Sequence, residues 1–158
     1  MSAESKMKPL TRRSCLRRAA ALSLVSIMPL PARATPQTMQ IAMESAFGDR
    51  PITPGRVNLD LPALAEDGNS VLLGVSVDSP MTKTDYVRFV QLFSPENPLP
   101  DVARFEFFPG SGMAEVKTRI RLSADQTIVA VAGLSDDSLW SALAQIRVVE
   151  GACLDGLI

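Results

Sequence analysis

The chain has 158 residues, with 16 lysines and arginines, 17 aspartates and glutamates, and no histidine. Without histidine it lacks the commonest general base and the commonest transition-metal ligand, so the sequence predicts neither a metal site nor another resident cofactor. A chain of this length can form one domain around a single hydrophobic core.

The first 34 residues have the three successive regions of an export signal. A basic stretch at residues 1–18 precedes an apolar run at 19–30, and Ala32-Arg33-Ala34 offers a cleavage site. Within the basic stretch, Thr11-Arg12-Arg13-Ser14-Cys15-Leu16-Arg17 resembles the twin-arginine export signal. We therefore expect export to the periplasm, with the mature protein beginning near Thr35.

Removing residues 1–34 changes the expected partners. The apolar run is shorter than the roughly 20 residues that a membrane span needs, so no membrane anchor is expected. The remaining residues carry nine basic and 16 acidic side chains, a formal charge of −7. Nucleic acids and anionic lipids require basic patches, so proteins and small molecules are the expected partners.

The first element expected in chain order is a short helix. Its apolar residues follow helical spacing at Met39, Ala42, Met43, Ala46 and Phe47. Gly48 comes directly after them as a candidate C-cap. Methionines on such a face are typical of a helix that packs on a core.

Beyond this helix the apolar residues follow a period of two, which predicts strands. Seven are expected, at residues 56–61, 71–77, 85–93, 103–108, 114–122, 127–134 and 144–149, separated by turn-forming sequences. Short strands without long intervening helices predict an all-β domain over residues 35–149. The expected fold is an immunoglobulin-like antiparallel β-sandwich of about seven strands preceded by a short N-terminal helix, with a small barrel as the alternative.

Residues 150–158 follow the last expected strand and contain Cys153, the only thiol that remains after removal of the export signal. It cannot form an internal disulfide. Chain ends are weakly restrained, and small residues surround this cysteine. No histidine or second cysteine is available to activate it, so the pattern favours a thiol presented to other proteins over a catalytic one. An inert thiol is the alternative.

Several segments, taken in order, resemble the SoxY family of sulfur-carrier subunits from the thiosulfate-oxidising Sox system. The resemblance covers essentially the whole chain, from the twin-arginine signal to Cys153. Its segments are Phe47-Gly48-Asp49, Gly55-Arg56-Val57, residues 61–68, Val77-Asp78-Ser79-Pro80-Met81, Asn97-Pro98-Leu99-Pro100, Thr118-Arg119-Ile120-Arg121-Leu122 and Ala130-Val131-Ala132.

This resemblance implies an immunoglobulin-like sandwich that forms a heterodimer with a SoxZ-like subunit. It also implies that Cys153, on a C-terminal arm, covalently holds sulfur derived from thiosulfate or another small sulfur anion. In the family, a periplasmic c-type cytochrome attaches the sulfur and a dimanganese hydrolase removes the sulfonate. Haem and metal then belong to partners, and the chain itself is expected to be a carrier and not an enzyme.

The sequence around Cys153 departs from the Gly-Gly-Cys-Gly-Gly arm usual in the family. Here the arm comprises Gly151, Ala152, Cys153, Leu154, Asp155 and Gly156, followed by Leu157 and Ile158. Either this arm suits different partners or sulfur donors, or its apolar end folds back onto the sandwich. A further alternative is an interaction protein whose degenerate arm uses Cys153 only for an intermolecular disulfide.

Overall fold

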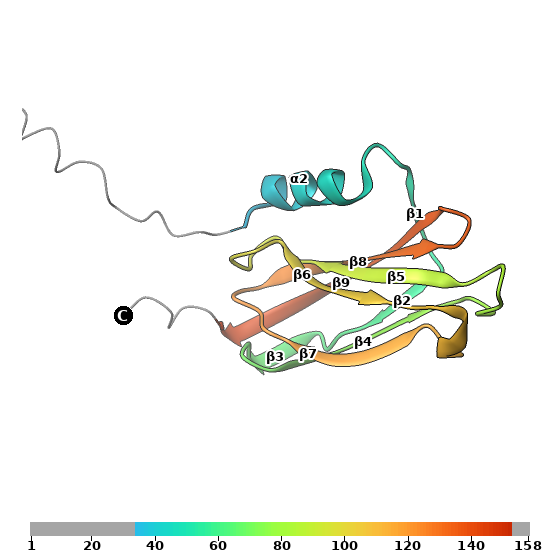
Figure 1. Cartoon of the computed structure of the whole chain (residues 1–158). Helices are drawn as coiled ribbons and strands as arrows, with labels where there is room; N and C mark the ends of the chain where they lie inside the picture. The colour runs from blue at the N-terminus through green and yellow to red at the C-terminus, as the bar shows by residue number, and fades with distance from the viewer. Residues whose placement is uncertain (1–33, 153–158) are drawn as a thin grey trace, which may run out of the picture. The chain divides into compact units, whose positions relative to one another are not determined.

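The computed structural model describes residues 34–152. The expected export signal and the residues from Cys153 onward lie outside this range. Within it, two β-sheets pack face to face, and helix α2 (Pro36–Phe47) lies on the outer face of the larger sheet (Figure 1). This arrangement confirms the predicted immunoglobulin-like β-sandwich preceded by a short helix.

The described residues contain nine strands. In the larger sheet the order is β1 (Ile52–Pro54), β9 (Leu139–Glu150), β8 (Gln126–Leu134), β5 (Val87–Phe93) and β6 (Asp101–Glu106), and β3 (Leu64–Asp67) also pairs with β9. The smaller sheet has the order β2 (Val57–Asp60), β4 (Val71–Val77) and β7 (Glu115–Ile120). A single 3₁₀ turn, η1 (Pro109–Ser111), lies between β6 and β7 in this part of the chain.

Each of the seven expected strands corresponds to an observed one, whereas β1 and β3 were not expected. Both pair with β9 in the parallel sense, so the sandwich is not purely antiparallel. Strand β1 has only three residues and ends in proline. Strand β3 reads Leu-Ala-Glu-Asp, whose last three residues are poor strand formers. Pairing with a distant strand, and not local propensity, holds both in extended form.

The main core lies between the two sheets. Strand β4 buries Val71, Leu73, Val75 and Val77, and β8 contributes Ile128 and other residues to the same cluster. The alternate residues of β8, Val129 and Val131, belong to a second cluster on the side of helix α2. Strand β8 is therefore buried on both faces, which explains its uninterrupted apolar sequence.

Helix α2 begins three residues earlier than its apolar spacing predicts. The side chain of Thr35 accepts a hydrogen bond from the Thr38 amide, and Pro36 occupies the first turn, both of which favour a helix start. The helix ends at Gly48, where φ is 65° and the amide donates to the carbonyl of Glu44. Phe47, at its last turn, packs into the second cluster.

Within residues 34–152, no helix is long and apolar enough to cross a membrane.

Candidate functional site

Strand β9 leads to the candidate site and changes partners before it ends. As far as Ile146 it pairs with β8, and from Arg147 to Glu150 it pairs with β3. On the side of β8, the amide of Val148 donates to Asp125 Oδ1 at 2.6 Å. The last residues of β9 are thus held on both edges at the end of the sandwich where β3 lies (Figure 1).

The chain stays attached to the sandwich beyond β9. The amide of Ala152 donates to the carbonyl of Leu122 at 2.8 Å, and the amide of Gly68 donates to the carbonyl of Glu150 at 2.7 Å. Leu122 in turn donates to the carbonyl of Gly68 at 2.9 Å. We call these three hydrogen-bonded residues, Gly68, Leu122 and Ala152, the arm root. Ala152 is only 1% exposed, so the residue immediately before the cysteine is docked.

Gly68 is at this position because the segments approach closely. A Cβ atom there would lie 2.2 Å from the Leu122 carbonyl oxygen and 2.8 Å from the Ala152 nitrogen. It would also lie 2.9 Å from Cγ1 of Val148. Two of these contacts are with backbone atoms, which cannot rotate away. Any side chain at residue 68 would therefore push the chain beyond β9 off the sandwich.

A buried polar network supports the loop that contains Leu122. Nδ2 of Asn97 donates to the Arg121 carbonyl at 2.8 Å, and its Oδ1 accepts from the Ser123 amide at 3.2 Å. The hydroxyl of Ser94 donates to Gln126 and also accepts from the Asn97 amide. Among the described residues, every buried side-chain polar atom has a partner. The network therefore fixes the carbonyl that receives the Ala152 amide.

Carboxylates lie on the segments that form the arm root. Asp67 Oδ1 accepts hydrogen bonds from the backbone amide and the side chain of Asn69, at 2.8 and 2.9 Å. These bonds, the backbone one first, lower the pKa of Asp67. Asp67 therefore stays ionised at the end of β3, next to Gly68, and Glu150 is its pairing partner on β9. An anionic species reaching this end of the molecule meets fixed negative charge.

The structure places only part of the predicted arm. Gly151 is half-buried and Ala152 is buried. Cys153, Leu154, Asp155 and Gly156 lie outside the described residues, as do Leu157 and Ile158.

Sequence reasoning did not single out Gly68, Asn97 or Leu122 as site residues. All three lie in segments that carry the family resemblance, which was the available signal. The structure brings these separate segments together at the arm root.

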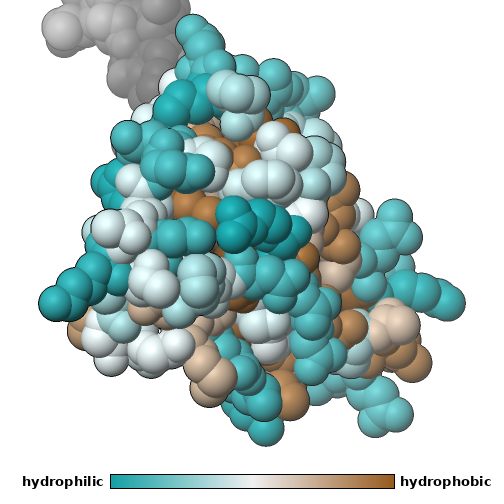
Figure 2. All heavy atoms as spheres, turned by 90° about the vertical axis from the view of Figure 1, so that its right-hand side faces the viewer, coloured by the Kyte–Doolittle hydropathy of each residue, from teal (hydrophilic) through white to brown (hydrophobic). Residues whose placement is uncertain are grey.

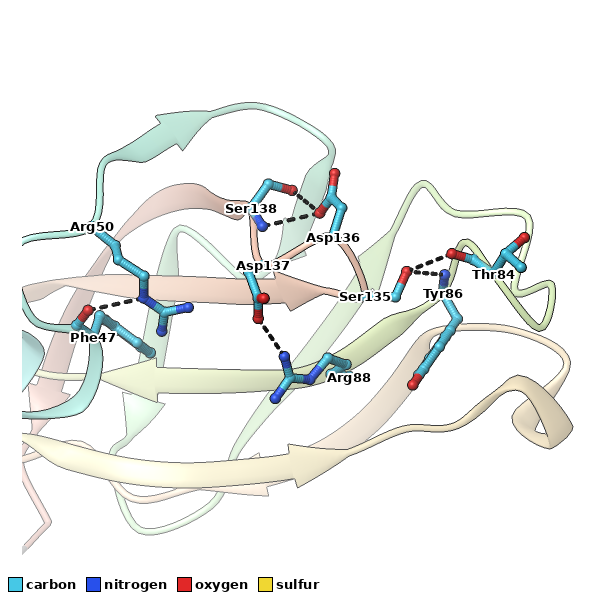
Figure 3. A network of polar contacts seen from close by, with 9 residues as sticks. All are labelled: Phe47, Arg50, Thr84, Tyr86, Arg88, Ser135, Asp136, Asp137 and Ser138. Atoms are coloured by element: carbon cyan, nitrogen blue, oxygen red, sulfur yellow. Dashed lines mark hydrogen bonds and ion pairs between the residues drawn. The ribbon is translucent and has the colours of Figure 1, made fainter.

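A second polar cluster surrounds the turn between β8 and β9 (Figure 3). Arg88 Nη1 lies 2.6 Å from Asp137 Oδ1, and Asp136 Oδ1 accepts from the hydroxyl of Ser138 at 2.6 Å and from its amide at 3.0 Å. The hydroxyl bond is the main cause of a lowered pKa at Asp136. Ser135 donates to the Thr84 carbonyl at 3.0 Å. These groups stabilise the turn through bonds with one another.

The face that Figure 2 turns toward the viewer is the end of the sandwich away from strand β3, and hydrophilic side chains cover much of it. Two apolar residues that flank η1 are exposed, Phe108 at 63% and Met113 at 70%. Within residues 34–152, no group of three or more potential metal-ligating side chains is present. The arm root is therefore the best candidate for function in the described part of the chain.

Fold and site together define a small immunoglobulin-like sandwich whose docked C-terminal segment leads directly into a cysteine. A family model described as "Sulfur oxidation protein SoxY" matches residues 43–153, more than half of the chain and including Cys153. The chain therefore belongs to the SoxY family, and its role is that of a sulfur carrier in sulfur oxidation. A comparison with curated proteins found no match.

Among similar solved structures, one is a SoxY protein and others share the fold. The sulfur carrier protein SoxY from Chlorobium limicola f thiosulfatophilum is 26% identical, with a TM-score of 0.60, over 71% of this chain and 96% of that one. A superoxide reductase (neelaredoxin) from Ignicoccus hospitalis is 21% identical, with a TM-score of 0.53, over 73% and 94%. A putative superoxide reductase from Thermotoga maritima is 22% identical, with a TM-score of 0.53, over 66% and 96%. The last two likenesses show the shared fold alone.

Proposed function

We propose that Cys153 is the residue to which sulfur is attached, and that the protein carries this sulfur between periplasmic enzymes. The observation that carries the proposal is the position of Cys153. It is the last residue of the SoxY family match and directly follows the docked Ala152.

The loading step joins the Cys153 sulfur to the sulfane sulfur of thiosulfate. A new sulfur–sulfur bond forms, the thiol proton is released, and two electrons pass to a c-type cytochrome as oxidant. In the next step water attacks the sulfonate sulfur, sulfate is released, and a persulfide remains on Cys153. A dimanganese hydrolase carries out that hydrolysis, so the acids, bases and metals of both steps belong to partners.

The same proposal includes a SoxZ-like subunit, with which the chain forms a heterodimer. It also includes export, with residues 1–34 as a twin-arginine signal. Three observations support this context: the family match, the basic and apolar order of the first 34 residues, and the small size of the domain.

Intact-protein mass spectrometry tests the attachment. The protein carries Cys15→Ser, so that Cys153 is its only cysteine, and it is incubated with thiosulfate, the SoxZ-like subunit and the oxidising cytochrome. The expected result is a mass increase of one thiosulfate unit that disappears on treatment with a reductant. Further substitution of Cys153→Ser abolishes it.

Two other outcomes would contradict the proposal. A reducible doubling of mass without any sulfur adduct would assign Cys153 to an intermolecular disulfide. An adduct that persists in the Cys153→Ser variant would place the attachment elsewhere. Omitting the cytochrome provides the control, because the loading step needs an acceptor for two electrons.

A further inference from the structure

We infer that Gly68 is a positioning residue for the carrier thiol, because its lack of a side chain allows Ala152 to dock and so fixes the backbone immediately before Cys153. The consequence for sulfur transfer rests on the proposed function of Cys153. The docking itself does not, because it is defined by hydrogen bonds among described residues.

The arm root shortens the free segment before the thiol. If the chain left the sandwich at the end of β9, residues 151–153 would all be free, and they could extend by roughly 10 Å. Because Ala152 is buried and its amide is bonded to Leu122, the backbone is held as far as the residue before Cys153. Consecutive Cα atoms are about 3.8 Å apart, so the cysteine backbone stays close to the arm root.

The arm root depends on three parts of the chain that are distant in sequence. The turn between β3 and β4 supplies Gly68, and the loop between β7 and β8 supplies the Leu122 carbonyl. Asn97 holds that loop through its contacts with Arg121 and Ser123. Each part is anchored without the arm, so the acceptor for the Ala152 amide is already in place when the segment docks.

This geometry limits how partners reach the thiol. Since the Cys153 Cα can lie only one Cα–Cα step, about 3.8 Å, from the docked Ala152, a partner enzyme that reacts with the thiol must approach this end of the sandwich. It would then contact the end of β3, which carries the carboxylate of Asp67, and the β7–β8 loop, which carries that of Asp125. The partner surface that complements these carboxylates carries basic residues around the entrance to the partner's active site.

Gly68→Ala is the direct test, and Gly110→Ala is its matched control. At residue 110 an added Cβ would come no closer than 3.4 Å, to the ring of Phe108, which is ordinary contact. In the parent protein, carrying Cys15→Ser, amide exchange followed by NMR is expected to show a protected Ala152. Overpacking at a tight contact strongly shifts the equilibrium between docked and undocked Ala152. Gly68→Ala should therefore lower the protection of the Ala152 amide about tenfold or more. Gly110→Ala should leave it unchanged.

Two further measurements separate positioning from general stability. Labelling of Cys153 by a bulky maleimide should become faster in Gly68→Ala but not in Gly110→Ala, while amides of β8 keep their protection. With the oxidising cytochrome as partner in the loading step, the KM for the unloaded carrier should rise more than kcat falls. If Gly68 had a purely structural role, Gly68→Ala would alter the protection of the β8 amides. Its labelling rate relative to the parent protein would then equal that of Gly110→Ala.

Ala152→Pro provides a second test if Gly68→Ala fails to fold. This substitution removes the one N–H that donates to Leu122 at the end of the chain, where no strand is interrupted. The amide of Gly68 should then lose protection and Cys153 should be labelled faster.

An unprotected Ala152 in the parent protein, or equal protection in Gly68→Ala, would overturn the inference. Exchange is measured without any sulfur compound. Failure of the arm root is therefore distinguishable from failure of Cys153 to load.

Discussion

Phe47 of helix α2 stacks on Phe89 of strand β5, with ring centroids 5.9 Å apart and ring planes 6° apart. Phe93 meets the same Phe47 ring edge-on, at 5.8 Å and 76°. Phe47 is the one buried residue of helix α2, and the half-buried Met39, Ala42 and Met43 pack on the same cluster. The aromatic contact is therefore the centre of the attachment of the helix to the outer face of the larger sheet.

Replacing Phe47 by alanine should therefore release helix α2. Truncation of a buried phenylalanine typically costs about 3–5 kcal/mol in free energy of unfolding, and urea denaturation would measure it. Ile41→Ala is the control on the same helix, because Ile41 is 63% exposed. It should change stability by less than about 0.5 kcal/mol. Similar losses in both variants would mean that the helix is not held by its Phe47 face.

Gly133→Ala should destabilise the larger sheet. A Cβ there would lie 2.3 and 2.4 Å from Cε1 and Cζ of Phe89. The Phe89 ring cannot move aside easily, because two side chains pack against it. The guanidinium of Arg104, on β6, lies 3.8 Å from the centroid of the Phe89 ring, and Phe47 stacks on the same ring. Overpacking of this kind costs about 1–3 kcal/mol, measurable as a lower urea midpoint. An unchanged midpoint would show that the ring has room to shift.

Asn97→Ala should destabilise the protein and loosen the loop at the arm root. The substitution leaves the Arg121 carbonyl and the Ser123 amide without their side-chain partner. Each buried polar group that loses its partner costs about 1–3 kcal/mol. The exposed Asn58 on β2 provides the control, and Asn58→Ala should be nearly neutral in the same denaturation experiment. Equal effects at the two positions would refute a special role for the buried network.

Stability should fall in acid in part because of Asp136. Its pKa lies below the ordinary 3.8, mainly through the Ser138 hydroxyl, so the unfolded chain takes up this proton at higher pH than the folded one. The stabilisation is complete well above pH 3.8 and is lost as the pH falls through the folded-state pKa.

Urea midpoints measured between pH 6 and pH 2.5, a range chosen to bracket that titration, would show this dependence. Both Asp136→Asn, which has no charge to titrate, and Ser138→Ala, which lacks the hydroxyl donor, should have a shallower decline than the wild type. A decline as steep in both variants would assign the acid sensitivity to other groups.

Much of the sandwich could be predicted from sequence because its strands have clear patterns. Strand β7 alternates cleanly, since one side faces the core and the other faces solvent. Strand β3 could not be predicted, because its residues favour other conformations and it is held by pairing with β9 more than 80 positions along the chain.

The candidate site divides in the same way. Cys153 stands out in the sequence as a lone thiol, whereas the arm root does not. Its specificity lies in backbone N–H and C=O groups, which every residue has, and in the absence of a side chain at Gly68. These backbone groups bond to one another only because the fold brings together the β3–β4 turn, the β7–β8 loop and the end of β9.

The change of partner along β9 also affects how the protein bears mechanical load. A partner that pulls on the C-terminal segment applies force along the axis of β9, across its hydrogen bonds with the parallel β3 and the antiparallel β8. Bonds loaded in shear must break together, whereas bonds loaded by peeling break one at a time. The strand that precedes Cys153 is therefore oriented so that tension on the C-terminal segment loads its hydrogen bonds in shear.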